Sequence, residues 1–357
     1  MPLSTTPSLS RRSLLLNAGR TAAGIAVLGG AGSFLSACAS SSAGDGSDGT
    51  VAYQLSWTKD YEFAGSYLAD DRGYWADNDL KVDLLAGGSS ADPLSIVASG
   101  KAMLASAHVH KVAQLMDSGG TKLKVVGALM QKYGLNILSR SDAPITSPKE
   151  LEGKKIGVFP SNDPAWALFL ELNDIDRSTI TEVPVQYDLT PLINGEIDGY
   201  QAYAGGELTT LRSAGVEPVA LLLADYGYNP VSAGYVVRAE SLEDKDQRAQ
   251  IKSFLIGEIK GWQDVVYGDG LEEGARLTVE KYGKDLGLDP ETQLASLEAL
   301  MPFISTPTTE EKGLLWMSDD SIASSQVVLD NAGIGLDVTD IVDLSLLEEI
   351  YGGKNRL

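Results

Sequence analysis

Strand-like and helix-like segments alternate along the chain from residue 51 onward, and this alternation limits the fold more than any other feature. Residues 51–56 and 80–85 are short apolar runs typical of strands, and residues 64–77 between them carry apolar side chains at helical spacing. Further strands are expected at residues 103–105, 124–129, 135–138, 155–159, 182–185, 197–202, 218–223 and 234–238. The pattern predicts an α/β fold, with mostly parallel sheets and helices on both faces.

The chain also divides into two units along its length. A new series of strands and helices begins after Asp142-Ala143-Pro144, and strand-like segments flank it on both sides. From residue 242 the pattern is mainly helical. We therefore expect two lobes joined by a hinge of two crossings, with residues 51–138 and 235–357 forming lobe 1 and residues 139–234 forming lobe 2.

The N-terminal segment resembles an export signal. Arg11 and Arg12 precede an apolar stretch without acids, as in twin-arginine signal peptides, and Leu35-Ser36-Ala37-Cys38 resembles a bacterial lipobox. Residues 1–37 are predicted to be a lipoprotein signal peptide, residues 38–50 a flexible tether, and Cys38 the lipid acceptor. The protein is then exported and anchored to the extracytoplasmic face of the cell membrane. The alternative is an inert Cys38 near a signal-anchor helix.

The charge of the chain excludes several kinds of partner. The formal net charge is −21, and the leader contributes three arginines and no acid, so the mature chain carries a charge near −24. Such a chain repels nucleic acid and anionic lipid headgroups, so membrane attachment has to come from the lipid at Cys38. Cys38 is the only cysteine, which excludes an intramolecular disulfide. We expect a monomer.

Several blocks of sequence resemble the type-II periplasmic solute-binding proteins of ABC importers, in the branch for nitrate, sulfonates, taurine and thiamine pyrimidine precursors. The resemblance lies in Leu55-Ser56-Trp57-Thr58-Lys59, Glu62-Phe63-Ala64-Gly65, Gly73-Tyr74-Trp75, Gly87-Gly88, Ile96-Val97-Ala98-Ser99-Gly100, Leu151-Glu152-Gly153-Lys154-Lys155, Pro191-Leu192-Ile193-Asn194-Gly195 and Asp225-Tyr226-Gly227. It implies two lobes that close on a small solute, and an ABC permease with its ATPase as partners.

Two departures from that family leave the solute open. Ala204-Gly205-Gly206-Glu207 stands where thiamine-precursor relatives often have Asn-Glu-Pro. Enzymatic relatives that make the thiamine pyrimidine use a cysteine-rich motif and an active-site histidine, whereas this chain has no cysteine after Cys38 and has Glu62 in the opening loop. We therefore expect a binding protein and no enzyme. A same-fold extracytoplasmic enzyme or a sensor remains the alternative.

Candidate ligand-binding residues follow the predicted strands, because ligands of open α/β sheets bind outside the carboxyl ends of the strands. Aromatic rings are expected to seat a planar ligand, carboxylates to accept its hydrogen bonds, and Ser161 and Asn162 to offer donors at the start of a helix. The set is Trp57, Tyr61, Glu62, Gly88, Ser89, His108, Tyr133, Ser161, Asn162, Trp166, Tyr203, Glu207, Asp225 and Tyr226. Trp57 and Trp166 are expected on opposite sides of the ligand.

The same loops contain few groups for other chemistry. His108 and His110 are the only histidines and have no carboxylate cluster at metal-ligand spacing, so no metal site is expected. No phosphate loop or nucleophile arrangement is present, and no cofactor is expected. Lys59 and Lys132 are the only bases near the predicted loops. This scarcity favours a pyrimidine-like nitrogen heterocycle, of thiamine-precursor type, over the alternative, a sulfonate or taurine-type organic anion.

Overall fold

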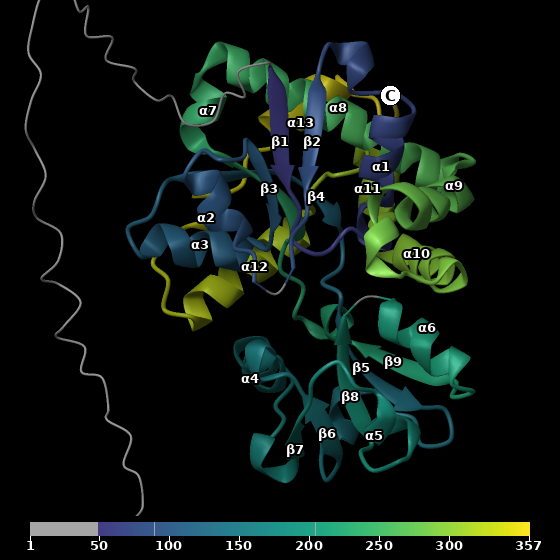
Figure 1. The fold of residues 1–357 in the computed structure, drawn as a ribbon. Helices are drawn as coiled ribbons and strands as arrows, with labels where there is room; N and C mark the ends of the chain where they lie inside the picture. Colours follow the sequence, from purple (N-terminus) through teal and green to yellow (C-terminus); the bar gives the residue numbers. More distant parts are fainter. Residues whose placement is uncertain (1–48, 89, 204) are drawn as a thin grey trace, which may run out of the picture. The chain divides into compact units, whose positions relative to one another are not determined.

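The computed structural model describes residues 49–88, 90–203 and 205–357, and these residues form two mixed sheets (Figure 1). The first sheet has the order β2-β1-β3-β10-β4 and the second the order β7-β6-β8-β5-β9. The strands of the first are β1 (Thr50–Gln54), β2 (Lys81–Leu85), β3 (Leu104–Ala107), β4 (Leu123–Met130) and β10 (Ser232–Arg238). Those of the second are β5 (Leu135–Arg140), β6 (Lys155–Val158), β7 (Thr181–Pro184), β8 (Gly199–Tyr203) and β9 (Pro218–Leu222).

Each sheet contains one strand that runs against the others. In the first sheet β10 is antiparallel to both β3 and β4, and in the second β5 is antiparallel to both β8 and β9. Both strands come directly after a crossing between the sheets. The chain leaves one sheet at the carboxyl ends of its strands and enters the other at the same edge, so the entering strand has to run in the opposite direction. The predicted fold class, with mostly parallel sheets and two crossings, is confirmed.

The lobe boundaries expected from the sequence, after residue 138 and after residue 234, fall inside β5 and β10. β5 pairs over its whole length with strands of the second sheet, so residues 135–138 do not belong with the first sheet. β10 pairs with the first sheet from Ser232 onward, so its start was assigned to the wrong lobe. The crossings are residues 131–134 and the segment after the short 3-10 helix Leu223–Tyr226. The pairing of strands decides where the lobes divide, and the local sequence pattern carries no information about that pairing.

Helices cover both faces of each sheet. In β10, Tyr235 and Val237 pack into one hydrophobic core and Val236 packs into another on the opposite face. In β5, Ile137 and Leu138 divide in the same way between two further cores. The longer helices are α1 (Ala64–Asp71), α3 (Val109–Asp117), α4 (Asp163–Leu172), α6 (Gly206–Ser213), α8 (Lys245–Tyr267), α9 (Gly270–Leu277), α10 (Pro290–Ile304) and α12 (Asp319–Asn331). The shorter ones are α2 (Pro93–Ala98), α5 (Thr190–Ile193), α7 (Ala239–Glu243), α11 (Pro307–Lys312) and α13 (Ser345–Tyr351).

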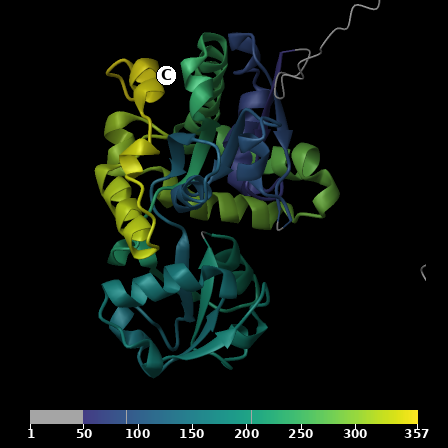
Figure 2. The same cartoon turned by 90° about the vertical axis from the view of Figure 1, so that its left-hand side faces the viewer.

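The helical C-terminal part of the chain returns to the first sheet. Figures 1 and 2 show residues after β10, coloured green to yellow, beside the strands of that sheet. α8 packs on α1, and Gly65 and Gly261 lie so close at this contact that neither position has room for a Cβ. The helix expected over residues 64–77 ends at Asp71, where a turn and a 3-10 helix (Ala76–Asn78) follow. No helix in the described parts of the chain is both long and apolar enough to span a bilayer.

Candidate ligand-binding cleft

A cavity of about 800 Å³ lies where the carboxyl ends of strands from both sheets meet. Its walls come from the loops after β1, β3, β6, β7 and β8, from the ends of β4 and β10, and from α10. Of the candidate site residues, the structure brings together at this cavity Trp57, Tyr61, Glu62, His108, Ser161, Asn162, Tyr203 and Glu207. The cavity is thus the place to which the strand-end rule pointed.

Trp166 does not line the cavity. It lies in the core of the second lobe with 1% of its surface exposed, its ring stacks on Phe169, and its Nε1 donates a hydrogen bond to Glu182 at 2.8 Å. α4 presents this residue to the core of the second lobe. Its place in the first turn of the helix did not by itself say which side it would face. The expectation that Trp57 and Trp166 approach a ligand from opposite sides is therefore wrong.

Four other candidates also lie outside the cavity lining. Tyr133 is buried behind Tyr203, edge-on to its ring at a centroid distance of 5.8 Å. Asp225 pairs with Lys132 at 2.7 Å, and the hydroxyl of Tyr226 donates to the carbonyl of Thr146 at 2.9 Å. Gly88 adopts a φ of +138° in the loop after β2 and is not a lining residue. Ser89 lies outside the described residues, as do Cys38, the signal peptide and most of the tether.

Hydrogen bonds fix the loop that presents Tyr61 and Glu62. Asp60 caps a short 3-10 helix (Tyr61–Phe63), and its Oδ1 accepts from the backbone N–H of Glu62 at 3.0 Å. The N–H of Tyr61 donates to Oε1 of Gln293 in α10, also at 3.0 Å. The start of α6, in the second lobe, lies close to the same loop. A Cβ built on Gly206 would stand 3.3 Å from the hydroxyl of Tyr61. The loop is therefore held against both α10 and the second lobe.

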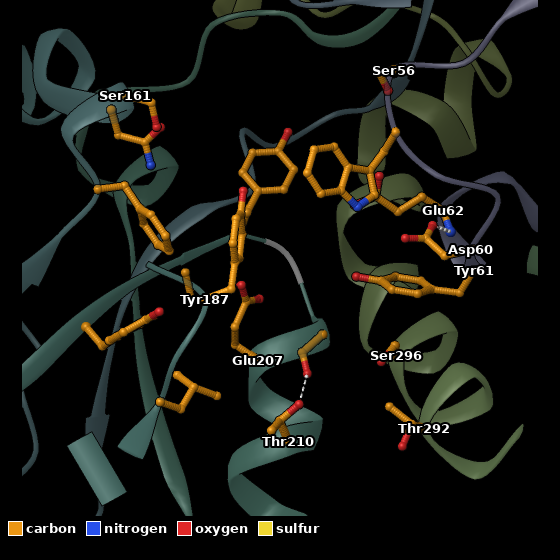
Figure 3. A pocket seen from close by; sticks show the side chains of 18 of the residues that line it. Ser56, Asp60, Tyr61, Glu62, Ser161, Tyr187, Glu207, Thr210, Thr292 and Ser296 are labelled. Atoms are coloured by element: carbon orange, nitrogen blue, oxygen red, sulfur yellow. Dashed lines mark hydrogen bonds between the residues drawn. The ribbon is translucent and has the colours of Figure 1, made fainter. Parts of the chain in front are cut away.

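Four carboxyl groups line the cavity, those of Asp60, Glu62, Asp188 and Glu207, and no lysine or arginine does so among the described residues. Figure 3 shows Asp60 and Glu62 on one side and Glu207 on the other. Burial raises the pKa of Asp60 to about 7. Burial also raises the pKa of Glu62, with a further contribution from the charges of Asp60 and Glu207, and it raises the pKa of Glu207 itself. The cavity therefore favours a ligand that is cationic or rich in hydrogen-bond donors.

Aromatic rings from both lobes form one wall. Trp57, after β1, lies 6.2 Å from Tyr187, after β7, measured between ring centroids. Tyr187 lies 5.2 Å from Phe159, and Phe159 meets Tyr200 edge-on at 5.7 Å. Sequence reasoning missed Phe159 and Tyr187, although both follow strands at the carboxyl edge. Phe159 falls inside the strand expected over residues 155–159, whereas the strand-end rule applied to the loop after β7 would have found Tyr187.

α10 supplies the other part of the lining that sequence reasoning missed. Thr292, Gln293 and Ser296 face the cavity from this helix, whereas Leu297 and Leu300 are buried in the core. Figure 3 shows Thr292 and Ser296 on the side of Tyr61. A polar strip on an otherwise apolar helix was the available signal, but it does not say what the strip faces.

His108 takes part in a partly buried hydrogen-bond chain at the junction of the lobes. Its Nδ1 lies 3.2 Å from Oγ of Ser232, which lies 2.7 Å from the hydroxyl of Tyr203. Burial, with a smaller effect of Lys111, lowers the pKa of His108 to about 4, so the ring is neutral at pH 7. His108 precedes α3, and its ring stacks on that of His110. Within the described residues, no three His, Cys, Asp or Glu side chains are grouped to hold a metal ion.

Comparison with protein families identifies the chain. The family described as NMT1/THI5 like matches residues 60–267, which is more than half of the 357 residues. The chain belongs to the NMT1/THI5-like family. The matched region contains β2 to β10 and both crossings, and it holds every described lining residue except Ser56, Trp57 and those of α10.

Two curated relatives of this NMT1/THI5-like chain are named as binding proteins. A formylaminopyrimidine-binding protein of Halalkalibacterium halodurans is 23% identical over 65% of this chain and 72% of its own length. The riboflavin-binding protein RibY of Chloroflexus aurantiacus is 23% identical over 85% of this chain and 87% of its own length. Both alignments extend well beyond one lobe.

Solved structures show the same fold. The putative periplasmic sulfonate-binding protein SsuA of Methylobacillus flagellatus superposes with a TM-score of 0.62 and 13% identity, over 85% of this chain and 94% of the other. The desulfurization enzyme DSZB superposes with a TM-score of 0.56 and 13% identity, over 85% and 99%. The expected resemblance to periplasmic solute-binding proteins is confirmed. The fold is also that of an enzyme, so it does not by itself decide between binding and catalysis.

Proposed function

We propose that this protein is the extracytoplasmic solute-binding component of an ABC importer and that its solute is a planar nitrogen heterocycle of the pyrimidine type. The observation that carries the proposal is the composition of the cavity. Aromatic rings from both lobes and four carboxyl groups line it, with no lysine or arginine among the described lining residues. Rings supply contact area and orientation, and carboxylates accept hydrogen bonds from ring amino groups.

A sulfonate or another organic anion fits this lining poorly. Anions in binding sites are held by Arg, Lys or several N–H donors, whereas the described lining contains no Arg or Lys and carries four carboxyl groups. The nearest base at the crossings, Lys132, is paired with Asp225 and does not line the cavity.

A flavin is the second candidate solute. The cavity of about 800 Å³ exceeds what a single pyrimidine ring occupies, and the relative named as a riboflavin-binding protein aligns with most of the chain. A flavin contains a pyrimidine ring fused into a larger plane, so the same wall of Trp57, Tyr187 and Phe159 suits it. Both candidates are planar nitrogen heterocycles with donor groups, and binding measurements separate them.

Closure of the two lobes on the solute would create the form that an ABC permease recognises. A solute that contacts both lobes binds the closed form more tightly and so shifts the population toward it. Trp57 and Glu62 stand on one lobe, and Tyr187 and Glu207 on the other. The lipid at Cys38 and the tether of residues 38–50 would keep the protein near the permease. Export by the twin-arginine route belongs to the same proposal.

An enzymatic role is less well supported. The described lining contains no cysteine or lysine to act as a nucleophile, and the imidazole of His108 is engaged with Ser232. A receptor that signals to a membrane kinase would use the same cleft, and a permease and an ATPase encoded beside it would favour import.

Thermal denaturation of the chain from residue 39 onward, with pyrimidines, riboflavin and alkanesulfonates each added in turn, tests the proposal. A ligand that binds only the folded state raises the melting temperature. We expect a rise with at least one pyrimidine or with riboflavin, and none with sulfonates. Calorimetry then gives the affinity. A rise with sulfonates alone would overturn the proposed solute class, and steady turnover of the bound compound would overturn the transport role.

A further inference from the structure

Gln293, in the first turn of α10, uses only one half of its side-chain amide within the protein. Its Oε1 accepts from the backbone N–H of Tyr61 at 3.0 Å. A backbone N–H can donate only to the oxygen of an amide, so this bond fixes which way the amide group is turned. No described residue accepts a hydrogen bond from Nε2 of Gln293. The amide therefore has a free donor on the side away from the backbone of Tyr61.

This free donor opens to the cavity. Gln293 lines the cavity wall with 7% of its surface exposed. Its Nε2 is not one of the unpartnered polar atoms that the described residues seal away from solvent. A bound solute that covered this N–H group without pairing with it would lose binding free energy, because a desolvated donor without an acceptor is costly. We therefore expect the solute to carry a hydrogen-bond acceptor at this place.

The other two lining residues of α10 already donate their hydroxyl hydrogens to protein groups. Oγ1 of Thr292 donates to Oδ2 of Asp289, the N-cap residue of the helix, at 2.7 Å. Oγ of Ser296 donates to Oγ1 of Thr209 at 3.5 Å. Among the lining residues of this helix, Gln293 therefore supplies the donor that remains for a solute.

A carbonyl oxygen on the ring suits this donor better than a ring nitrogen. The amide of Gln293 is recessed in the wall, as the low exposure of the residue shows. A carbonyl oxygen stands about 1.2 Å beyond the ring atom that carries it, whereas a ring nitrogen lies in the ring edge itself. The carboxyl group of Glu62, in the loop that Gln293 holds, can accept a hydrogen bond from an N–H of the same ring.

We propose that Gln293 is a specificity-determining residue, whose Nε2 donates a hydrogen bond to a carbonyl oxygen on the ring of the solute. The protein then prefers oxo-substituted nitrogen heterocycles to heterocycles that carry amino groups alone. The inference rests on the proposed function and narrows its solute class. α10 lies beyond residues 60–267, which the family model matches, so the preference comes from a part of the chain outside the matched region.

Calorimetry with three pyrimidines tests the preference. 4-Aminopyrimidine has no carbonyl group, whereas cytosine and 6-aminopyrimidin-4-one each carry one, at different ring positions. We expect at least one of the two oxo probes to bind at least tenfold more tightly than 4-aminopyrimidine, which is toward the low end for pairing a buried donor. If riboflavin alone binds, its 2-thio and 4-thio analogues replace the pyrimidines, because sulfur is a weaker acceptor than oxygen. One of these analogues should then bind at least tenfold more weakly than riboflavin.

Two variants and a control locate the effect. Gln293→Met keeps the volume of the side chain without a donor, so the carbonyl preference should fall below threefold. Gln293→Glu keeps an oxygen for the N–H of Tyr61 and removes the amide hydrogens, so it should show the same loss, and it carries the test if Gln293→Met fails to fold. Thr292→Val, at the neighbouring position of α10, should change the affinity for all probes by the same factor and keep the preference.

The remaining outcomes also decide the matter. Affinities within threefold of one another in the wild-type protein would overturn the role of Gln293 and leave the proposed function standing. A uniform loss of affinity in Gln293→Met, with the carbonyl preference intact, would mean that Gln293 only holds the loop of Tyr61. If neither the pyrimidines nor riboflavin bind the wild-type protein, the proposed solute class fails and the inference fails with it.

Discussion

The indole of Trp57, in the first lobe, lies 6.2 Å from the ring of Tyr187, in the second, with the two ring planes inclined at 44°. The pair joins the two lobes along one wall of the cavity. Tyr187 keeps 78% of its surface exposed, so its ring is placed at the rim and not in the core. A planar ligand that enters here would exchange solvent for aromatic surface on both lobes at once.

Trp57→Ala should weaken binding of the solute by about 1–3 kcal/mol, the range for loss of an aromatic stacking partner. Stability should change less, because Trp57 is only partly buried. Calorimetry and denaturant melts measure the two effects separately. Tyr187→Ala is the matched variant on the other lobe and should weaken binding in the same direction. Native affinity in both variants would exclude stacking of the solute on these two rings.

Trp166→Ala should show the opposite pattern. Trp166 is a fully buried core residue, so its removal should lower the free energy of unfolding by about 3–5 kcal/mol. The protein that remains folded should bind the solute with nearly normal affinity, since Trp166 does not line the cavity. Titration at a temperature well below the melting midpoint checks this. A large loss of affinity with little loss of stability would return Trp166 to the binding site.

Asn229 holds the two crossings together. Its Oδ1 accepts from the N–H of Tyr133 at 2.7 Å, and its Nδ2 donates to the carbonyl of Gln131 at 3.3 Å. Asn229→Ala leaves both partly buried backbone groups without this partner, which should lower stability by about 1–3 kcal/mol. Denaturant melts measure the loss, and small-angle scattering should show a broader distribution of shapes.

The control for this prediction is Asp225→Asn, which removes the ion pair with Lys132 at the same crossings. Both side chains are about half exposed, 42% and 51%, so the loss should stay below about 1 kcal/mol. Equal effects of the two substitutions would mean that Asn229 has no special role in the hinge.

Glu258 should make stability depend on pH in a defined direction. Burial raises its pKa from 4.5 to about 7, even though Ser66, Tyr235 and Trp262 donate hydrogen bonds to it. Above pH 4.5 the unfolded chain loses this proton while the folded protein keeps it, so the stability contribution is lost as pH rises from about 5 to 7. Glu258→Gln cannot titrate, so wild type should lose about 2 kcal/mol relative to the variant between pH 5 and pH 8.

The comparison with a variant is necessary because the two histidines change stability with pH in the opposite direction. Burial lowers the pKa values of His108 and His110 to about 4 and about 3, so they cost stability as pH falls below 6.5. Taking the difference between wild type and Glu258→Gln at each pH cancels this term. A difference that stays constant from pH 5 to pH 8, or that has the opposite sign, would mean that Glu258 is charged throughout.

Cys38→Ala should abolish acylation and prevent normal lipoprotein maturation. The reason is that Cys38 is the only thiol in the sequence and stands in a lipobox-like segment. Mass spectrometry of the wild-type N-terminal peptide is the direct measurement. An unmodified Cys38 in protein recovered from membranes would contradict the anchor.

The sequence by itself determined the fold class and part of the cleft. Alternating strands and helices are local patterns, and the ligand edge follows from them, so Trp57, Glu62, His108, Tyr203 and Glu207 were found at the ends of their strands. Whether a helix residue faces a core or a cavity is not local, which is why Trp166 was misplaced. β5 and β10 pair with strands that are far away in sequence. This pairing, which the local pattern does not contain, decided where the lobes divide. Thr292 and Ser296 reach the cleft because the C-terminal helices return to the first sheet, a consequence of packing that no segment of sequence records.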